Sequence, residues 1–410
     1  MLSLELFLAL LLAAIVVVVL SARLRFAYTI ALVLLGFGTG IIANLTGFIA
    51  IPGSVSELFS PNLFFDILLP PIVFEAAIHV NVRLLRRRLT LVLFLVIVGV
   101  VFTTIFAGVV VGYLTALPLV AALLLAAILS PTDPVAVVDL FRRLRVPEEL
   151  STIVESEALL NDAAGVILFI VLLGVASSTA STLSGDILQF GWLAIGGVVI
   201  GLLVAGGVYI IHRWVNDAAV ETALTVVAAF GSFLVAQDVG ASGIVSTAIA
   251  GIAFGTLVAP RAVDPAVRVA VSAFWRVVVY IANSIIFLAM GLLFVLSSLL
   301  AHLGLIVLVF VTLLLGRALL VGAFRAATAR GPGSLPGVWY NVITLAGIRG
   351  AIPIVLALSL YTTPTTLAPD VVQAIVAAAF GVAFMSIIVG NLASDAYVKR
   401  HFPSATGPSD

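Results

Sequence analysis

The sequence predicts an all-α polytopic membrane protein that crosses the bilayer about thirteen times. Of the 410 residues, 63% are hydrophobic and only 9% are charged, whereas a soluble domain is about half apolar and about one quarter charged. Such an excess of apolar side chains can be hidden only in lipid. The chain has no cysteine, which excludes disulfides, thiolate metal sites and cysteine nucleophiles. Its 19 basic residues balance 19 acidic ones, so no basic face for a nucleic acid is expected.

Apolar stretches of about 20 residues, the length that spans about 30 Å of hydrocarbon, recur from end to end. Each is expected to be helical, because an open sheet edge cannot satisfy its backbone groups in lipid. Continuous apolar runs, instead of alternating segments of about ten residues, argue against a transmembrane barrel. The expected spans are 2–21, 27–44, 60–79, 89–115, 118–141, 149–176, 187–211, 218–237, 241–259, 268–298, 303–327, 338–360 and 370–395.

Basic residues occur in every second connection between these spans, and the connections in between carry only acidic residues as charges. All but three of the 19 basic residues therefore lie on one side, which the positive-inside rule makes cytoplasmic. We expect a protein of the inner (plasma) membrane with its amino terminus outside and a short cytoplasmic tail, 397–410. The three exceptions, Arg276, Arg317 and Arg349, lie within spans.

Two spans are interrupted by residues that a transmembrane helix does not need. The fifth contains Ser-Pro-Thr-Asp-Pro at 130–134, and the twelfth contains Gly-Ile-Arg-Gly-Ala-Ile-Pro at 347–353. Because the two spans stand seven positions apart, an odd offset, they run in opposite directions, as expected of inverted repeats whose discontinuous helices cross at the midplane. The alternative is that each proline merely kinks a bundle helix. A charged residue inside both interruptions favours the binding site.

Five charged residues are expected deep in the membrane. At about 1.5 Å of rise per residue, Glu75, Asp133, Glu157, Asp162 and Arg349 all fall in the inner and middle zone of a bilayer about 30 Å thick. A central charge costs about 2.5–3.5 kcal/mol even on a lenient insertion scale. These side chains must therefore pair with one another, face water or bind an ion.

The sixth span concentrates polar residues in one run. Residues three, four or seven apart share a helix face, so Glu155, Ala158 and Asp162 form one stripe, and Glu157 lies above Asn161 on another. Glu155 is expected either to attract cations in a cytoplasmic funnel or to be an ordinary first-turn charge.

The depths suggest how these charges are compensated. Arg349 is the basic residue of comparable depth in a broken helix, so one carboxylate is expected to pair with it. Asn161 can donate a hydrogen bond to Asp133 without adding charge. Asp162 is then the carboxylate left to alternate between a proton and a cation.

Four motifs follow one another along the chain. They are Leu-Pro-Pro at 69–71 with Phe-Glu-Ala at 74–76, Thr-Asp-Pro at 132–134, the Glu…Asn-Asp run at 157–162, and Gly-Ile-Arg-Gly-Ala at 347–351. In order and spacing they resemble the monovalent cation/proton antiporter family, specifically its NhaP-type sodium/proton exchanger branch. The resemblance covers essentially the whole chain.

The resemblance implies an NhaA/NhaP-like antiporter fold of thirteen helices, arranged as two inverted six-helix repeats plus a linking helix. Residues 1–396 would form one transporter unit with a dimerisation part (about 1–80 and 218–298), a core part (about 89–176 and 303–395) and a linking helix at 187–211. Relatives are homodimers that need no cofactor. They exchange one sodium or lithium ion for one proton, which serves sodium transport and pH homeostasis.

The resemblance also implies residue roles. Asp162 would be the main ligand of cation and proton, and Thr132 and Asp133 would supply oxygens at the helix break. Glu75 would reach the ion directly or through water. A structural ion pair would join Glu157 to Arg349.

Two positions depart from the family pattern. Ala158 stands where relatives usually have a serine whose hydroxyl contacts the ion, so backbone oxygens, water or Ser156 would have to replace it. Trp275-Arg276 stands where relatives commonly have Trp-Glu, and the sequence assigns Arg276 no role.

Competition between proton and cation for Asp162 is sufficient for coupled exchange, so we expect a transporter and not an enzyme. Asn161 stands where an electrogenic relative has a second acid, which predicts electroneutral 1:1 exchange. A potassium/proton antiporter would share every motif, and Ala158 makes that alternative credible. A cation channel, from a different functional class, would need a continuous pore. An intramembrane aspartyl protease fits Asn161 and the broken helices poorly.

Overall fold

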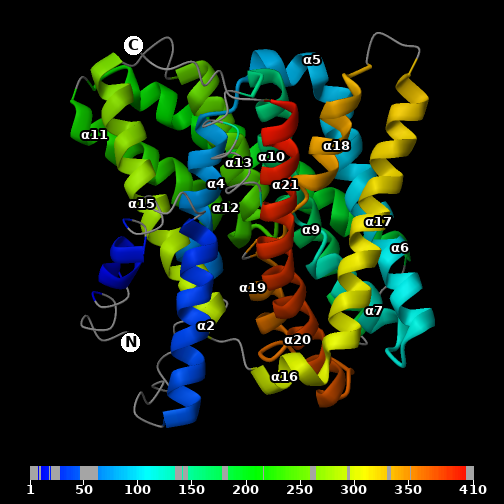
Figure 1. Cartoon of the computed structure of the whole chain (residues 1–410). Coiled ribbons are helices and arrows are strands. Elements are labelled where there is room, and N and C mark those ends of the chain that lie inside the picture. The colour runs from blue at the N-terminus through cyan, green and yellow to red at the C-terminus, as the bar shows by residue number, and fades with distance from the viewer. Residues whose placement is uncertain are drawn as a thin grey trace. The chain divides into compact units, whose positions relative to one another are not determined.

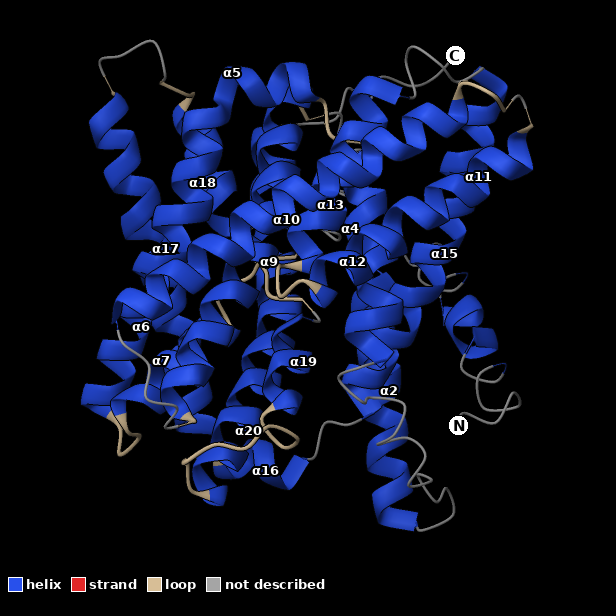
Figure 2. Ribbon diagram, turned by 180° about the vertical axis from the view of Figure 1, so that it is seen from behind, coloured by secondary structure: helices blue, strands red, loops and turns tan. Residues whose placement is uncertain are grey.

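In the computed structural model, helices make up the secondary structure of the described part of the chain, and no strand occurs there (Figure 2). The predicted all-α class is therefore confirmed. The structure describes residues 8, 11–17, 19, 28–46, 63–133, 141, 146–177, 183–215, 217–258, 265–292, 296–329, 334–350 and 352–402.

Most helices coincide with the predicted spans to within a few residues. The fourth starts at Val82 and not at 89, the helix in the fifth span ends at Ile128 and not at 141, and the last runs to His401 and not to 395. Seven of the helices within the described ranges are long and apolar enough to cross a membrane. The expected span 2–21 falls largely outside those ranges, as do the basic connections at 20–27, 142–145 and 259–264 and the tail from 403. The count of thirteen helices stays a prediction.

The chain divides into two compact units. Unit 1 comprises Met1–Val82 and Ala180–Leu293, and unit 2 comprises Arg83–Thr179 and Phe294–Asp410. The expected linking helix belongs to unit 1. Whether the units act as dimerisation and core parts stays a prediction.

Unit 1 is built of helices, some of which are short segments that adjoin π-helical turns (Figure 1). In chain order its elements are α2 (Tyr28–Thr46), η1 (Leu63–Leu68), α4 (Leu69–Ile78), α10 (Leu183–His212), α11 (Ala218–Val226), η3 (Val227–Gly231), α12 (Ser232–Asp238), α13 (Gly243–Ala253), η4 (Phe254–Val258) and α15 (Pro265–Leu292).

Glycines allow α2 and α15 to pack with their backbones in contact. A Cβ atom on Gly36 would overlap the carbonyl oxygen of Leu288, and one on Gly291 would overlap the backbone of Val33 and Phe37. The hydrophobic effect does not drive helices together within lipid, so the association of membrane helices depends on close packing of this kind.

A buried aromatic cluster packs α15 against α4. The fully buried Trp275 packs against Phe74, with ring centroids 5.0 Å apart. Its indole N–H donates to the hydroxyl of Thr225 at 2.9 Å, which satisfies the one polar atom that the ring buries. The neighbouring Arg276 is exposed on α15.

Unit 2 contains both interrupted spans. Its elements are α5 (Val82–Leu93), η2 (Phe94–Val98), α6 (Gly99–Leu114), α7 (Leu119–Ile128), α9 (Glu148–Ala176), α16 (Leu296–Ala301), α17 (Leu303–Thr328), α18 (Gly337–Leu345), α19 (Ile352–Ser359), α20 (Pro369–Met385), η5 (Ser386–Gly390) and α21 (Asn391–His401).

Prolines mark where several helices of unit 2 begin. Pro118, Pro147 and Pro336 are the N-cap residues of α7, α9 and α18, and Pro369 is the first residue of α20. Proline suits these positions because the first helical turn does not need its missing N–H. Between such starts, α9 runs unbroken for 29 residues and provides the rigid element that carries the polar run 155–162.

Candidate functional site

The two interrupted spans meet inside unit 2. Helix α7 ends at Ile128 and α18 ends at Leu345, and residues 129–133 and 346–350 beyond them are not helical. The backbone N–H of Asp133 donates to the carbonyl oxygen of Ile348 at 2.6 Å. This contact joins the two breaks directly and confirms that the discontinuous helices come together.

Gly350 allows the two breaks to approach so closely. A Cβ atom there would overlap the Cβ and Oδ2 atoms of Asp133. Any larger residue would have to push the carboxylate or the backbone aside, since both segments are irregular backbone packed within the unit. The glycine of the second motif therefore positions the carboxylate of the first.

Arg349 satisfies carbonyl oxygens that the breaks leave without helical partners. Its Nε donates to Leu129 O at 3.2 Å, and its Nη1 donates to Gly347 O. Its own backbone N–H donates to the hydroxyl of Ser386 at 2.9 Å. The side chain is 2% exposed, so it neutralises the negative ends of α7 and of its own segment from inside the protein.

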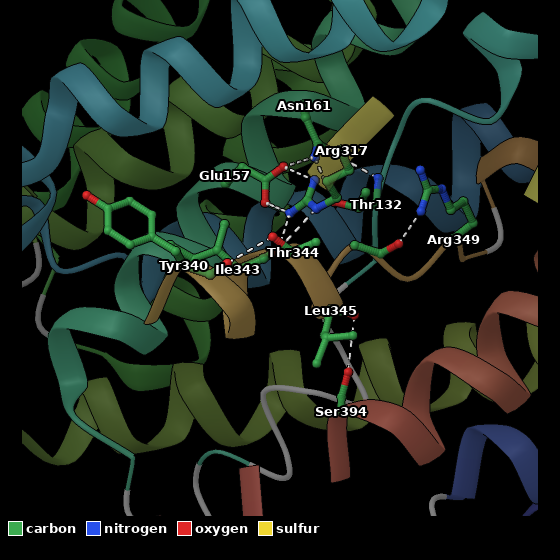
Figure 3. A network of polar contacts seen from close by, with 11 residues as sticks. Thr132, Glu157, Asn161, Arg317, Tyr340, Ile343, Thr344, Leu345, Arg349 and Ser394 are labelled. Atoms are coloured by element: carbon green, nitrogen blue, oxygen red, sulfur yellow. Dashed lines mark hydrogen bonds and ion pairs between the residues drawn. The ribbon is translucent and has the colours of Figure 1, made fainter. Parts of the chain in front are cut away.

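Glu157 is paired with Arg317 of α17, and not with Arg349 as the sequence and the family resemblance led us to expect. The guanidinium donates from Nη1 to Oε1 at 3.0 Å and from Nη2 to Oε2 at 2.8 Å (Figure 3). It also donates from Nε and Nη2 to the carbonyl oxygen of Ile343. One buried arginine thus fastens α9 to the end of α18.

The physical reason for this correction is that Arg349 lies in irregular backbone, where unpaired carbonyl groups compete for its donors. Arg317 lies in the middle of the intact helix α17, whose own backbone needs no side-chain donor. Its fork of donors is therefore available for a bidentate contact with a carboxylate, the geometry that guanidinium groups favour. Depth along the membrane did not distinguish the two arginines.

Asn161 also differs from the expectation, because its side chain contacts Thr132 and Glu157 where we expected Asp133. Its Nδ2 donates to Thr132 Oγ1 and to Glu157 Oε1, both at 2.7 Å. Its Oδ1 accepts from the backbone N–H of Thr132 at 3.2 Å. The amide therefore links the ion-paired carboxylate to the first helix break (Figure 3).

Asp162 follows Asn161 on α9 and has a different environment. It is half-buried, and within the described ranges no hydrogen bond or ion pair joins its carboxylate to a neighbour. The charged groups that act on it most strongly are the carboxylates of Asp133 and Glu157. A carboxylate beside two others, with no cation of the protein on it, is a site where a proton or a cation would be stabilised.

Other predicted ligands on α9 are distributed around the helix. Ala158 is buried and brings no oxygen. Ser156 is buried, and its hydroxyl has no partner among the described residues. Glu155 lies nearer the start of the helix, where its Oε1 accepts from Ser151 at 2.8 Å.

Glu75 belongs to unit 1, where it lies on α4. Its carboxylate is 3.5 Å from Nδ1 of His79, one turn further along, and the same ring nitrogen is 2.9 Å from the carbonyl oxygen of Glu75. The pair is partly exposed.

Sequence reasoning did not find Arg317 and Ser386. The signal for Arg317 was present, because it is an arginine in the middle of a strongly apolar span, where an unpaired charge is costly. Ser386 gave no such signal, since isolated serines are common in membrane helices.

Comparison with known proteins identifies a family. A family model described as "Sodium/hydrogen exchanger, transmembrane" matches residues 8–399. The chain is 31% identical over 387 residues to the Na⁺/H⁺ antiporter ApNhaP of Aphanothece halophytica, which covers 91% of this chain and 69% of that protein. It is 30% identical over 396 residues to the Na⁺/H⁺ antiporter NhaH of Halobacillus dabanensis, with 94% of each chain covered.

A solved structure shares the fold. The sodium proton antiporter MjNhaP1 from Methanocaldococcus jannaschii superimposes with a TM-score of 0.80 at 22% sequence identity, over 97% of each chain. The predicted antiporter fold is therefore confirmed.

Proposed function

This chain belongs to the sodium/hydrogen exchanger family of transmembrane proteins, and from that premise we propose that it exchanges one sodium ion for one proton across the membrane. It acts as a secondary active transporter and not as an enzyme. Both substrates compete for the carboxylate of Asp162, and the carrier changes access between the two sides only when that carboxylate is neutralised.

The different states of Glu157 and Asp162 carry this proposal. Glu157 is held by two guanidinium donors and one amide donor, so its charge is already compensated. Asp162 has no such donors within the described ranges. A carboxylate that lies near other carboxylates and lacks a protein cation is stabilised by a proton or a cation from solution.

Exchange by a single carboxylate predicts the stoichiometry. One negative charge that carries sodium in one direction and a proton in the other moves no net charge in a cycle. Asn161 cannot add a second exchangeable charge, because it is a neutral amide occupied by Thr132 and Glu157. We therefore propose electroneutral 1:1 exchange.

The helix breaks supply further oxygens. Thr132 and Asp133 lie on the first break, and sodium, as a hard cation, favours carboxylate, hydroxyl and carbonyl oxygens. Arg349 keeps the carbonyl ends of the breaks neutralised. In this proposal Ser156 replaces the hydroxyl that Ala158 lacks, and the expected role of Glu75 stays a prediction.

The membrane arrangement completes the proposal. The chain is a multi-pass membrane protein, and the distribution of its basic residues supports an orientation with the amino terminus outside and the carboxyl terminus in the cytoplasm of a plasma membrane. We propose that it works as a homodimer, as the family resemblance implies.

The test is an ion-flux assay in proteoliposomes. An imposed pH gradient should be dissipated when sodium or lithium is added to the outside, and clamping the membrane potential should leave the rate unchanged because no net charge moves. Potassium at the same concentration should have at most about one tenth of the effect.

Three results would contradict parts of this proposal. Dissipation by potassium in preference to sodium would favour a potassium/proton antiporter and would assign the missing oxygen at Ala158 a role in selectivity. A rate that follows the membrane potential would exclude 1:1 exchange. Cation uptake without proton movement would exclude antiport altogether.

A further inference from the structure

The start of α5 carries three exposed arginines on one helix face. Arg83, Arg86 and Arg87 are spaced at i, i+3 and i+4, which places them side by side. We name these three residues the α5 arginine face. On the other side of the same turn, Leu85 is buried in unit 2, so this part of α5 is amphipathic.

The α5 arginine face is continuous with a membrane span. One apolar helical span runs from Val82 through η2 to Leu114, with a kink at Arg88. Exposed apolar side chains recur every four residues beyond the arginines, at Leu89, Leu93, Ile97, Val101 and Ile105. These side chains face acyl chains in a bilayer, so the arginines that precede them lie at the level of the lipid headgroups.

The length of the helix supports this placement. From Leu89 to Leu114 it rises about 39 Å at 1.5 Å per residue, enough to cross a hydrocarbon core of about 30 Å with some tilt. Helical geometry is interrupted at Arg88 (φ −118°, ψ 17°), between the arginine face and the apolar stripe. Both views draw α5 at the end of unit 2 where α18 also begins (Figures 1 and 2).

Arg88 forms an ion pair within the chain, unlike the three arginines that precede it. Its Nε donates to Glu149 at the start of α9 at 2.6 Å, and its side chain is only 22% exposed. No ion pair joins Arg83, Arg86 or Arg87 to an acid within the described ranges. All three side chains are exposed.

We propose that the α5 arginine face binds the phosphate groups of anionic phospholipids in the leaflet that the charge pattern makes cytoplasmic. Guanidinium groups bind phosphate oxygens in bidentate geometry and are weakly hydrated, which suits the interface. Each arginine near an anionic leaflet contributes about 1 kcal/mol, or roughly a fivefold gain in lipid affinity.

This contact reaches the candidate site through one hydrogen bond. Arg88 lies directly after the arginine face and is bonded to Glu149, which belongs to the first turn of the helix that carries Glu157 and Asp162. Anionic lipid therefore holds the segment to which the start of α9 is attached.

The experiment compares lipid binding by the full chain, purified in a neutral detergent and stripped of lipid. Native mass spectrometry measures the retention of phosphatidylglycerol and of phosphatidylcholine in separate titrations. The wild type should favour phosphatidylglycerol, and increasing salt should weaken that preference. The triple variant Arg83→Gln, Arg86→Gln, Arg87→Gln should lose phosphatidylglycerol affinity by more than about tenfold.

Two further variants make the result specific. A triple variant with Arg213→Gln, Lys399→Gln and Arg400→Gln removes the same charge from other exposed positions and should retain the lipid. Replacing the three α5 arginines by lysine keeps the charge and should keep most of the affinity, which separates loss of binding from misfolding.

The proposal is overturned if the glutamine variant retains phosphatidylglycerol as well as the wild type, or if the control variant loses it to the same extent. It is also overturned if inorganic phosphate at millimolar concentration displaces the lipid, because the partner would then be a soluble anion. Failure here leaves sodium/proton exchange untouched, since ion flux is measured separately.

Discussion

Helix α9 presents two acidic side chains five positions apart in opposite chemical situations. Glu157 accepts from Arg317 twice and from Asn161 once, at distances between 2.7 and 3.0 Å. Asp162 has no comparable donor within the described ranges, and the charged groups that act on it most strongly are other carboxylates. The same residue class on the same helix is therefore ion-paired at one position and without such donors at the other, which fits the substrate-binding role proposed for Asp162.

The difference shows how a membrane protein can keep one charge exchangeable. In the proposed mechanism, Glu157 receives the donors that keep it ionised, and Asp162 lacks them so that it can bind a proton or sodium. Removing the charge of Asp162 should thus reduce transport without reducing stability. Breaking the ion pair of Glu157 should first reduce stability. The predictions below separate those two effects.

The largest expected effect is on transport. Asp162→Asn keeps the shape of the side chain but removes the negative charge that sodium and protons share, so exchange should fall by more than about a hundredfold, to the background of empty liposomes. Thermal stability in detergent should not decrease, because the carboxylate makes no hydrogen bond within the described part of the chain. Ion flux in proteoliposomes and a thermal unfolding scan measure the two quantities.

Asp370→Asn is the matched control for that variant. It is the same chemical change at an exposed position in the first turn of α20, so transport should stay near the wild-type rate. Exchange by Asp162→Asn above about one tenth of that rate would refute the role given to Asp162.

The next effect is on stability. Arg317→Gln leaves the buried carboxylate of Glu157 without its cation, and breaking a buried pair in this way costs about 3–5 kcal/mol. The variant should have the lowest unfolding temperature of those described here. Adding Glu157→Gln should restore part of the loss, because the double variant has no uncompensated buried charge.

Arg349→Gln is the control for the combination of Arg317→Gln with Glu157→Gln. Its donors serve carbonyl oxygens and not Glu157, so combining it with Glu157→Gln should give no such restoration. If Glu157→Gln rescued Arg349→Gln but not Arg317→Gln, the pairing described here would be wrong.

A smaller effect is expected at the contact between the breaks. Gly350→Ala introduces a methyl group into the space of the Asp133 side chain, and such overpacking costs about 1–3 kcal/mol. Transport should fall together with stability because the shifted carboxylate belongs to the proposed cation site. Unfolding temperature and sodium-driven flux are measured on the same preparation.

Gly322→Ala is the control for Gly350→Ala. A Cβ atom there meets nothing within 4 Å, and alanine favours a helix over glycine by about 1 kcal/mol, so stability should be equal or slightly higher. Equal behaviour of the two variants would show that the close approach at Gly350 is unimportant.

Much of the fold could be predicted because lipid imposes simple rules on sequence. Apolar length located the spans, and helix-breaking residues beside charges located both interruptions. Asp133, Asn161 and Thr132 were selected as neighbours in one site, and the structure does bring their segments together. The role of Asp162 in ion binding remains a prediction.

The pairing inside the site could not be predicted from the sequence. Depth is a single coordinate, and Arg317 and Arg349 have similar depths, so only the lateral positions of the helices decide which one reaches Glu157. The partner of the Asn161 amide could not be predicted for the same reason, because Thr132 and Asp133 are adjacent in the chain and only the lateral position decides between them. The free carbonyl groups of a broken helix also need hydrogen-bond donors, and the sequence pattern does not show which side chain supplies them.

The smallest effect is expected for an ion pair that differs from Arg317–Glu157 mainly in its exposure to water. Arg88 and Glu149 form the same kind of pair as Arg317 and Glu157, but their side chains are 22% and 29% exposed, against 8% and 2%. Water and salt screen the outer pair, so Arg88→Gln should cost about 0–1 kcal/mol, and increasing salt should reduce even that. Unfolding scans at low and high salt measure both variants side by side. A loss for Arg88→Gln as large as for Arg317→Gln would mean that fastening the start of α9, and not compensating a buried charge, governs the stability of this unit.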